Sequence, residues 1–246
     1  SVGEALRFYK LGPEALTVRI KGVDGIQREA PFYRLVAERL LEQNGLGVDL
    51  LDAHSAAWDL HRASATVIGH SRVPAARLRR SIAAVIRELT AQVQPAGALA
   101  SIAKMNCFDL VVCLTPDELV LKALATSQPA VIVEVRSYAP RADSSQDPDI
   151  PTSRIGAIRL FHPLGRAEAA TEFAIHEEDA LEYLYRFRDE GERRAKELLT
   201  ALRCSDLLFL GCGLPDWMGR GLMRLVNDQR LSASERTMEF FCASAR

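Results

Sequence analysis

The sequence predicts an α/β fold, in which a parallel sheet of about six strands carries helices on both faces. Two continuous apolar runs, "FDLVVCL" at residues 108–114 and "AVIVEV" at residues 130–135, are typical of strands buried on both faces. Each run is followed or preceded by a helix-like stretch. The stretch "DLLFLGCGLPDWMGRGLMRL" at residues 206–225 adds a strand, a glycine turn and a helix. This alternation predicts a doubly wound sheet.

The composition predicts one globular unit over residues 1–246. Of the 246 residues, 48% are hydrophobic, which is enough for a sizeable core. A net charge of −1 argues against nucleic acid or an anionic membrane surface as the main partner. Apolar runs stay well short of the roughly 20 residues that cross a bilayer, and the first residues lack the layout of a signal peptide. We therefore expect neither a nucleic-acid nor a membrane partner.

The five cysteines are an odd number and include no C-x-x-C pair. A disulfide framework and a cysteine zinc site are both disfavoured by this pattern, and a reducing cytoplasm is the expected compartment.

The N-terminal half begins with a strand and continues with helices. "ALTVRI" at residues 15–20 reads as a short strand, and "VDGIQ" after it as a hairpin-like turn, because Asp-Gly favours positive φ. Pro31 starts a helix whose apolar residues recur at helical spacing, and Gly45 can end it. Further helices are expected at about 50–65 and 75–94. We therefore predict a helical subdomain at about residues 45–100.

The C-terminal half alternates strands and helices. After the strand at 108–114 we expect a helix at 117–126 and a buried strand at 130–135. A surface loop at 138–153 leads to a strand at 155–161 and then to a long helical zone at 171–203 that breaks near Gly191. The strand–turn–helix unit and a last strand at 237–244 follow.

Four of these segments resemble sirtuin-like domains. "CFDLVVCLTPDELVLKAL" is similar to the family's central strand, which normally ends in Thr-Thr-Asn-Tyr-Asp. "IRLFHPLGR", "IHEEDALEYL" and "LLFLGCGLPDWMGRGLMRL" resemble the next strand, the helix after it and the closing strand–turn–helix, where a Gly-x-Ser touches the adenosine of NAD. They cover about residues 105–228. The resemblance implies a Rossmann-like NAD-binding fold.

The N-terminal part resembles the bacterial branch of this family found in anti-phage proteins, some of them fused to Toll/interleukin-receptor-type domains. The four-cysteine zinc module of true deacylase sirtuins is absent from the sequence.

The family's catalytic positions are altered in this sequence. The asparagine that orients the water or ribose corresponds to Thr115, which is followed by Pro116. The catalytic histidine corresponds to Leu164, and His162 stands two residues earlier. The substitutions remove a positioning group and an acid/base group together, so catalysis by the family's route is not expected.

The family's phosphate-binding loop has also changed. "LGPEAL" keeps Gly12, but Pro13 removes a backbone donor that a phosphate cradle would use. The serine that touches the nucleotide corresponds to Gly213. The matching positions that remain are helix-cap aspartates and turn glycines: Asp117, Gly165, Gly211 and Asp216.

We therefore predict a degenerate sirtuin-like module that acts as an assembly or nucleotide-sensing domain of a bacterial immune or signalling protein. The residues themselves establish no cofactor, and NAD or an ADP-ribose derivative is the ligand that the resemblance implies. Its binding residues would be Gly12, Gly211, Gly213, Asp216 and Arg166. A homo-oligomer or a fused or partner effector domain would complete the assembly. The alternative is an active NAD glycohydrolase that uses His162, Asp117 and Thr115.

The state of the cleft separates the two functions. An open, polar cleft near His162 would favour the enzyme, whereas a cleft filled by Leu164, Phe161 and Trp217 would favour the pseudoenzyme.

Some polar residues allow two interpretations. Arg159 and Arg166 could hold a phosphate or pair with carboxylates such as Glu177, Glu178 and Asp179. Helical spacing could bring His54 and His61, with Asp52 and Asp59, to a metal, although amphipathic helices often carry such pairs by chance. Cys212 and Trp217 are expected to pack rather than to react or to stack on a base.

Overall fold

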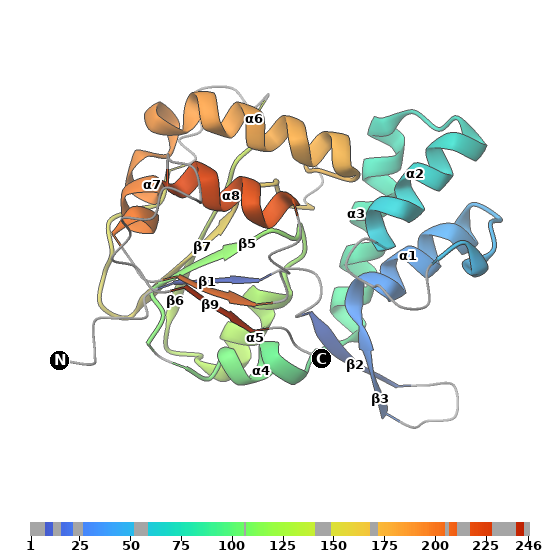
Figure 1. The fold of residues 1–246 in the computed structure, drawn as a ribbon. Helices are drawn as coiled ribbons and strands as arrows, with labels where there is room; N and C mark the ends of the chain where they lie inside the picture. Colours follow the sequence, from blue (N-terminus) through green and yellow to red (C-terminus); the bar gives the residue numbers. More distant parts are fainter. Residues whose placement is uncertain are drawn as a thin grey trace.

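The structure is a computed structural model of the 246-residue chain. It describes residues 8–11, 16–21, 27–51, 59–105, 107–140, 149–167, 172–204, 207–210, 217–227 and 240–243. Figure 1 shows a layered body with a group of helices beside it. None of the described helices is long and apolar enough to cross a membrane.

The main sheet is parallel. Its strand order is β6-β7-β5-β1-β8-β9, and every neighbouring pair runs in the same direction. The strands are β1 (Phe8–Leu11), β5 (Leu110–Cys113), β6 (Ile132–Ser137), β7 (Ala157–His162), β8 (Leu207–Leu210) and β9 (Phe240–Ala243). With helices beside the parallel strands β6, β7 and β5, the predicted α/β class is confirmed.

Helices cover both faces of the sheet (Figure 1). On one side lie α4 (Gly97–Ile102) and α5 (Leu119–Ser127), and on the other α6 (Glu177–Arg194), α7 (Lys196–Arg203) and α8 (Trp217–Asn227). Successive residues of β5 belong to different hydrophobic clusters: Val111 and Cys113 to the first, Leu110 and Val112 to the second. A strand directs alternate side chains to opposite faces, so β5 is buried on both sides, as its apolar run predicts.

The helices beside the sheet are α1 (Phe32–Gln43), α2 (Asp59–Ser71) and α3 (Ala75–Gln92), with a 3₁₀ turn at Val48–Leu50. A small antiparallel sheet of β2 (Thr17–Lys21), β3 (Gln27–Pro31) and β4 (Gln94–Pro95) adjoins them. The predicted hairpin is confirmed by the β2–β3 pairing, although its turn lies outside the described residues.

Three sequence predictions about these elements are wrong. β6 is an edge strand rather than a buried one, and its Ile132 is 66% exposed. The long helical zone does not break near Gly191, because α6 continues to Arg194 and the break falls at Ala195. A single glycine costs a helix only about 1 kcal/mol, which tertiary packing overrides. The helix expected to end at about residue 65 continues to Ser71, and residues 52–58 of the predicted range lie outside the described residues.

Candidate functional site

The candidate site lies where β5 and β7 end, on the side of the sheet that faces α1 to α3 (Figure 1). Val112 of β5 pairs with Phe161 of β7, so the residues that follow these strands are neighbours. Parallel α/β sheets bind their ligands at this carboxyl edge. The structure therefore brings together Thr115, Asp117 and His162, three of the residues singled out in the sequence.

His162 is the last residue of β7 and is 1% exposed. Its Nδ1 lies 2.9 Å from the carbonyl oxygen of Thr115, which can only accept, so Nδ1 carries the proton and donates it. Nε2 is buried and has no hydrogen-bond partner within the described part of the chain. Burial lowers the pKa of His162 to about 4, and outweighs the Thr115 carbonyl and the Asp117 charge, which raise it. The imidazole is therefore neutral at pH 7.

Asp117 is fully buried and both of its carboxylate oxygens are engaged. Oδ1 accepts a hydrogen bond of 2.9 Å from the backbone N–H of Leu119 at the start of α5. Oδ2 accepts one of 2.7 Å from the hydroxyl of Tyr33 in α1. Burial, together with the Asp117 charge, raises the pKa of Tyr33 well above its usual value. Asp117 thus joins the first residue of α5 to α1, and because its side chain is fully buried it presents no surface to a substrate in this structure.

Tyr33 was not singled out in the sequence. It stands 84 residues before Asp117, and no local pattern links the two. It reads as one member of the apolar stripe of α1, where it is indeed buried.

The other polar groups of the edge also have partners. The Thr115 side chain is buried, with Oγ1 3.0 Å from Cys113 Sγ. Arg166 donates a hydrogen bond of 2.7 Å to Glu118. Arginine and carboxylate neutralise one another there, so the edge presents less positive charge to a phosphate than the sequence suggests.

The positions named as cleft-filling are buried where the structure describes their side chains. Phe161 is fully buried and Leu164 is 3% exposed. Gly165 follows in the left-handed conformation, with φ +81°, and forms an isolated bridge with Phe173. The side chain of Trp217 lies outside the described part, as do Gly12, Gly211, Gly213, Asp216 and Cys212.

The arginines left open by the sequence are paired with carboxylates. Arg159 donates to Asp109 over 2.8 Å near the beginning of the strands, away from the carboxyl edge. Asp179, named as a partner for these arginines, instead accepts two hydrogen bonds of 3.0 Å from Arg79 of α3. This pair ties the helical part to α6.

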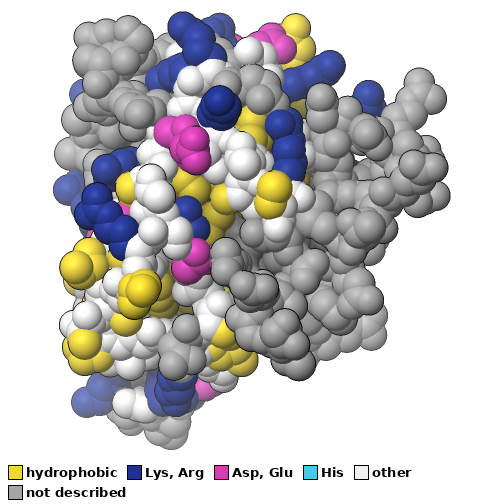
Figure 2. Space-filling model, turned by 90° about the vertical axis from the view of Figure 1, so that its left-hand side faces the viewer, with side chains coloured by type: hydrophobic (Ala, Val, Ile, Leu, Met, Phe, Trp, Pro, Cys, Tyr) yellow, Lys and Arg dark blue, Asp and Glu magenta, His cyan; other side chains and the backbone are white. Residues whose placement is uncertain are grey.

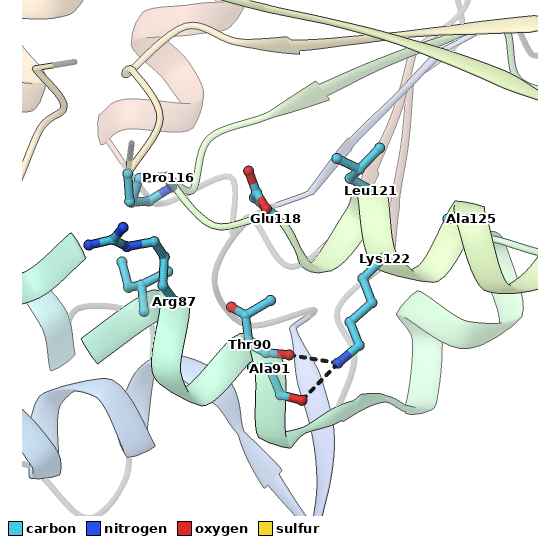
Figure 3. Close-up of a pocket in the computed structure, with 10 residues that line it drawn as sticks. Arg87, Thr90, Ala91, Pro116, Glu118, Leu121, Lys122 and Ala125 are labelled. Carbon is cyan, nitrogen blue, oxygen red and sulfur yellow. Dashed lines mark hydrogen bonds between the residues drawn. The ribbon is translucent and has the colours of Figure 1, made fainter. Parts of the chain in front are cut away.

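A pocket of about 380 Å³ opens between α3 and α5, next to the turn that carries Asp117. Its lining is Ile86, Arg87, Thr90, Ala91, Pro116, Glu118, Leu121, Lys122, Ala125 and Ala167. Figure 3 shows Lys122 reaching from α5 to the end of α3, where its Nζ donates to the carbonyl oxygens of Thr90 and Ala91. Lys122 therefore caps α3. The pocket combines an apolar wall with a charged rim, and its volume lies within the range of small-molecule sites, roughly 300–1,000 Å³.

A metal site finds no support in the described residues, where no three His, Cys, Asp or Glu side chains come together. Asp52 and His54 lie outside them. His61 is largely buried beside His176 and Asp179, and burial lowers its pKa to about 4.

No protein-family model and no curated protein matches the chain.

The low pKa of His162 gives stability a pH dependence. Between about pH 6.5 and pH 4 the unfolded chain binds a proton at this histidine and the folded chain does not, so stability falls as the pH falls through this window. We expect the loss of unfolding free energy from pH 7 to pH 5, measured with urea, to be smaller in His162→Gln by about 2 kcal/mol. His61 is present in both proteins, so its contribution to the pH dependence cancels in the comparison. Equal losses in both proteins would contradict this.

Proposed function

We propose that the chain is a sirtuin-like module with a Rossmann-like sheet that no longer cleaves NAD and serves a bacterial immune or signalling protein as an assembly or nucleotide-sensing domain. The observation that carries the proposal is the engagement of Asp117 and Thr115 in internal contacts at the carboxyl edge of β5. Both side chains are buried, and each is bonded to another part of the protein.

The chemistry of NAD cleavage explains why this engagement matters. The reaction needs a polar group held beside the ribose and donors or charges aimed at the developing oxocarbenium-like centre. Asp117 is fully buried, and its two oxygens accept hydrogen bonds from Tyr33 and Leu119. The position of the family's histidine is filled by Leu164, a buried apolar side chain. These contacts support a structural role for the altered positions.

The pocket between α3 and α5 supports the sensing role. It adjoins Pro116 and Glu118, so a ligand there would contact the same turn that holds Asp117. A nucleotide could place its base against the apolar wall and its phosphates near Arg87. Binding would then bias the position of α3 relative to α5.

A thermal-shift titration with NAD, ADP-ribose and cyclic ADP-ribose tests this role. A ligand at 100 times its dissociation constant adds about 2.7 kcal/mol, a shift of a few degrees. Ala125→Trp fills the pocket and should abolish the shift, whereas Thr126→Trp, on the next exposed residue of α5, should retain it. A shift that survives Ala125→Trp would show that the ligand binds outside this pocket. If no nucleotide shifts the melting temperature, the sensing role is contradicted and only the assembly role remains.

An active NAD glycohydrolase is the second candidate, and one observation favours it. Nε2 of His162 is unprotonated, buried and without a partner among the described side chains, as a general base would be before it meets its substrate. In this function, His162→Ala would abolish NAD turnover.

A further inference from the structure

β6 presents an open backbone at the edge of the sheet. Among the described strands it pairs with β7 alone. Ile132 donates its N–H to the Gly156 carbonyl over 3.1 Å, and Tyr138 donates to that of His162 over 3.0 Å. Backbone groups of a strand alternate in direction, so the residues between these two that point their N–H and C=O away from β7 are Val133, Val135 and Ser137.

Within the described part of the chain, β6 carries neither proline nor a bulge, and no described strand pairs with its free edge. Proteins guard an edge strand with proline, a bulge, charged side chains or a covering element. The charged side chains of β6 are Glu134 and Arg136, and the Arg136 guanidinium donates to the outward Val135 carbonyl over 3.0 Å, so this acceptor is occupied within the single chain. Ile132 at the start of β6 is 66% exposed, and Ile155 in the adjoining turn is fully exposed. Figure 2 shows hydrophobic side chains gathered beside basic ones on the side of the molecule where the strands begin.

The charges on β6 are complementary to those of a second copy. Glu134 and Arg136 point to the same face, since they are two residues apart. If two β6 strands pair antiparallel about a two-fold axis at Val135, Glu134 of each lies opposite Arg136 of the other. These positions form the non-hydrogen-bonded pairs, whose side chains approach most closely.

The two neighbouring antiparallel registers are disfavoured by the same charges. A two-fold axis at Glu134 would place that carboxylate opposite its own copy, and an axis at Arg136 would do the same for the guanidinium. Like charges directly opposite one another destabilise a strand pair. Intermediate registers would set inward-directed backbone groups of one strand against outward-directed groups of the other.

We propose that a second copy of this chain binds along β6, antiparallel and centred on Val135, so that the two sheets become continuous. Arg136 releases the Val135 carbonyl and turns to Glu134 of the other copy. Val135 then exchanges both backbone hydrogen bonds with its own copy, and Val133 does so with Ser137. A symmetric contact of this kind closes after two subunits. The contact itself is argued independently of the proposed function. Only its role rests on that function, in which this dimer would be the contact through which the module assembles.

Sedimentation equilibrium of the full chain over a concentration series tests the contact. We expect a dimer that Glu134→Arg or Arg136→Glu weakens by about tenfold or more in dissociation constant, because each reversal sets like charges opposite one another twice. The double variant Glu134→Arg/Arg136→Glu restores opposite charges and should restore the dimer. Arg188→Glu, the same charge change on an exposed residue of α6, should leave association unchanged.

Val135→Pro provides a second route. The Val135 N–H points away from β7, so proline there removes an intersubunit donor and leaves the β6–β7 ladder intact. A folded monomer is expected, with circular dichroism as the check on folding. A wild-type chain that is monomeric at every concentration, or a dimer indifferent to both single reversals and to proline, would overturn the proposal. NAD turnover would overturn the non-catalytic function and leave this contact standing, so the two failures are distinguishable.

Discussion

Gly165→Ala is expected to destabilise the protein by about 3 kcal/mol, the sum of a left-handed backbone and a steric clash. The residue has φ +81°. A Cβ there would lie 2.4 Å from the carbonyl oxygen of Glu172 and 2.7 Å from the Cα of Phe173. Both contacts are with backbone, so no side-chain rotation relieves them, and the turn after His162 must shift.

Gly156→Ala is the matched control for this prediction. Gly156 has nearly the same backbone, with φ +79°, but no heavy atom within 4 Å of its added Cβ. Gly156→Ala should therefore lose only the free energy that alanine needs to adopt the left-handed conformation, about 1 kcal/mol. Urea unfolding measures both variants. Equal losses would mean that the close approach to Phe173 does not constrain the site.

Asp117→Ala is expected to cost about 2–4 kcal/mol, because it removes the acceptor of the first N–H of α5 and leaves the buried Tyr33 hydroxyl without its acceptor. Tyr33 is only 2% exposed, so water cannot replace the lost bond. The loss should appear as a lower free energy of unfolding in urea, and as weaker protection of the first amides of α5 against hydrogen exchange.

Asp117→Asn separates the hydrogen bonds from the charge. Asparagine keeps one acceptor for the Leu119 N–H, and its amide can donate to the Tyr33 oxygen, so a loss of about 1 kcal/mol is expected. Tyr33→Phe completes a double-mutant cycle, in which the coupling to Asp117→Ala should be clearly above zero. An alanine variant as stable as the asparagine variant would show that Asp117 is not a structural anchor.

Local signals were enough to predict the centre of the sheet. β5 was predicted because it is apolar throughout, and a strand between two neighbours has both faces buried. Asp117 was expected to cap the helix that follows it, because it is an acidic residue directly before an apolar helical stretch. The N-cap position is Glu118, which makes no side-chain cap bond, and Asp117 accepts the Leu119 N–H from one residue further out.

Non-local contacts were beyond the sequence. The run at 130–135 is as apolar as that of β5, yet β6 lies at the edge, because strand order depends on tertiary packing rather than on hydrophobicity. The Tyr33–Asp117 bond joins segments with no shared pattern. The partners of Arg159 and Arg166 depended in the same way on which strands and turns became neighbours.

NAD consumption is the most direct test of the central claim that the groups at this carboxyl edge are structural. Wild type, His162→Ala and Asp117→Asn would be incubated overnight with NAD under conditions in which each protein is folded, and the nicotinamide released would be quantified. No release above the protein-free blank is expected from any of the three proteins. Release by the wild type that His162→Ala abolishes would contradict this claim and establish the glycohydrolase instead.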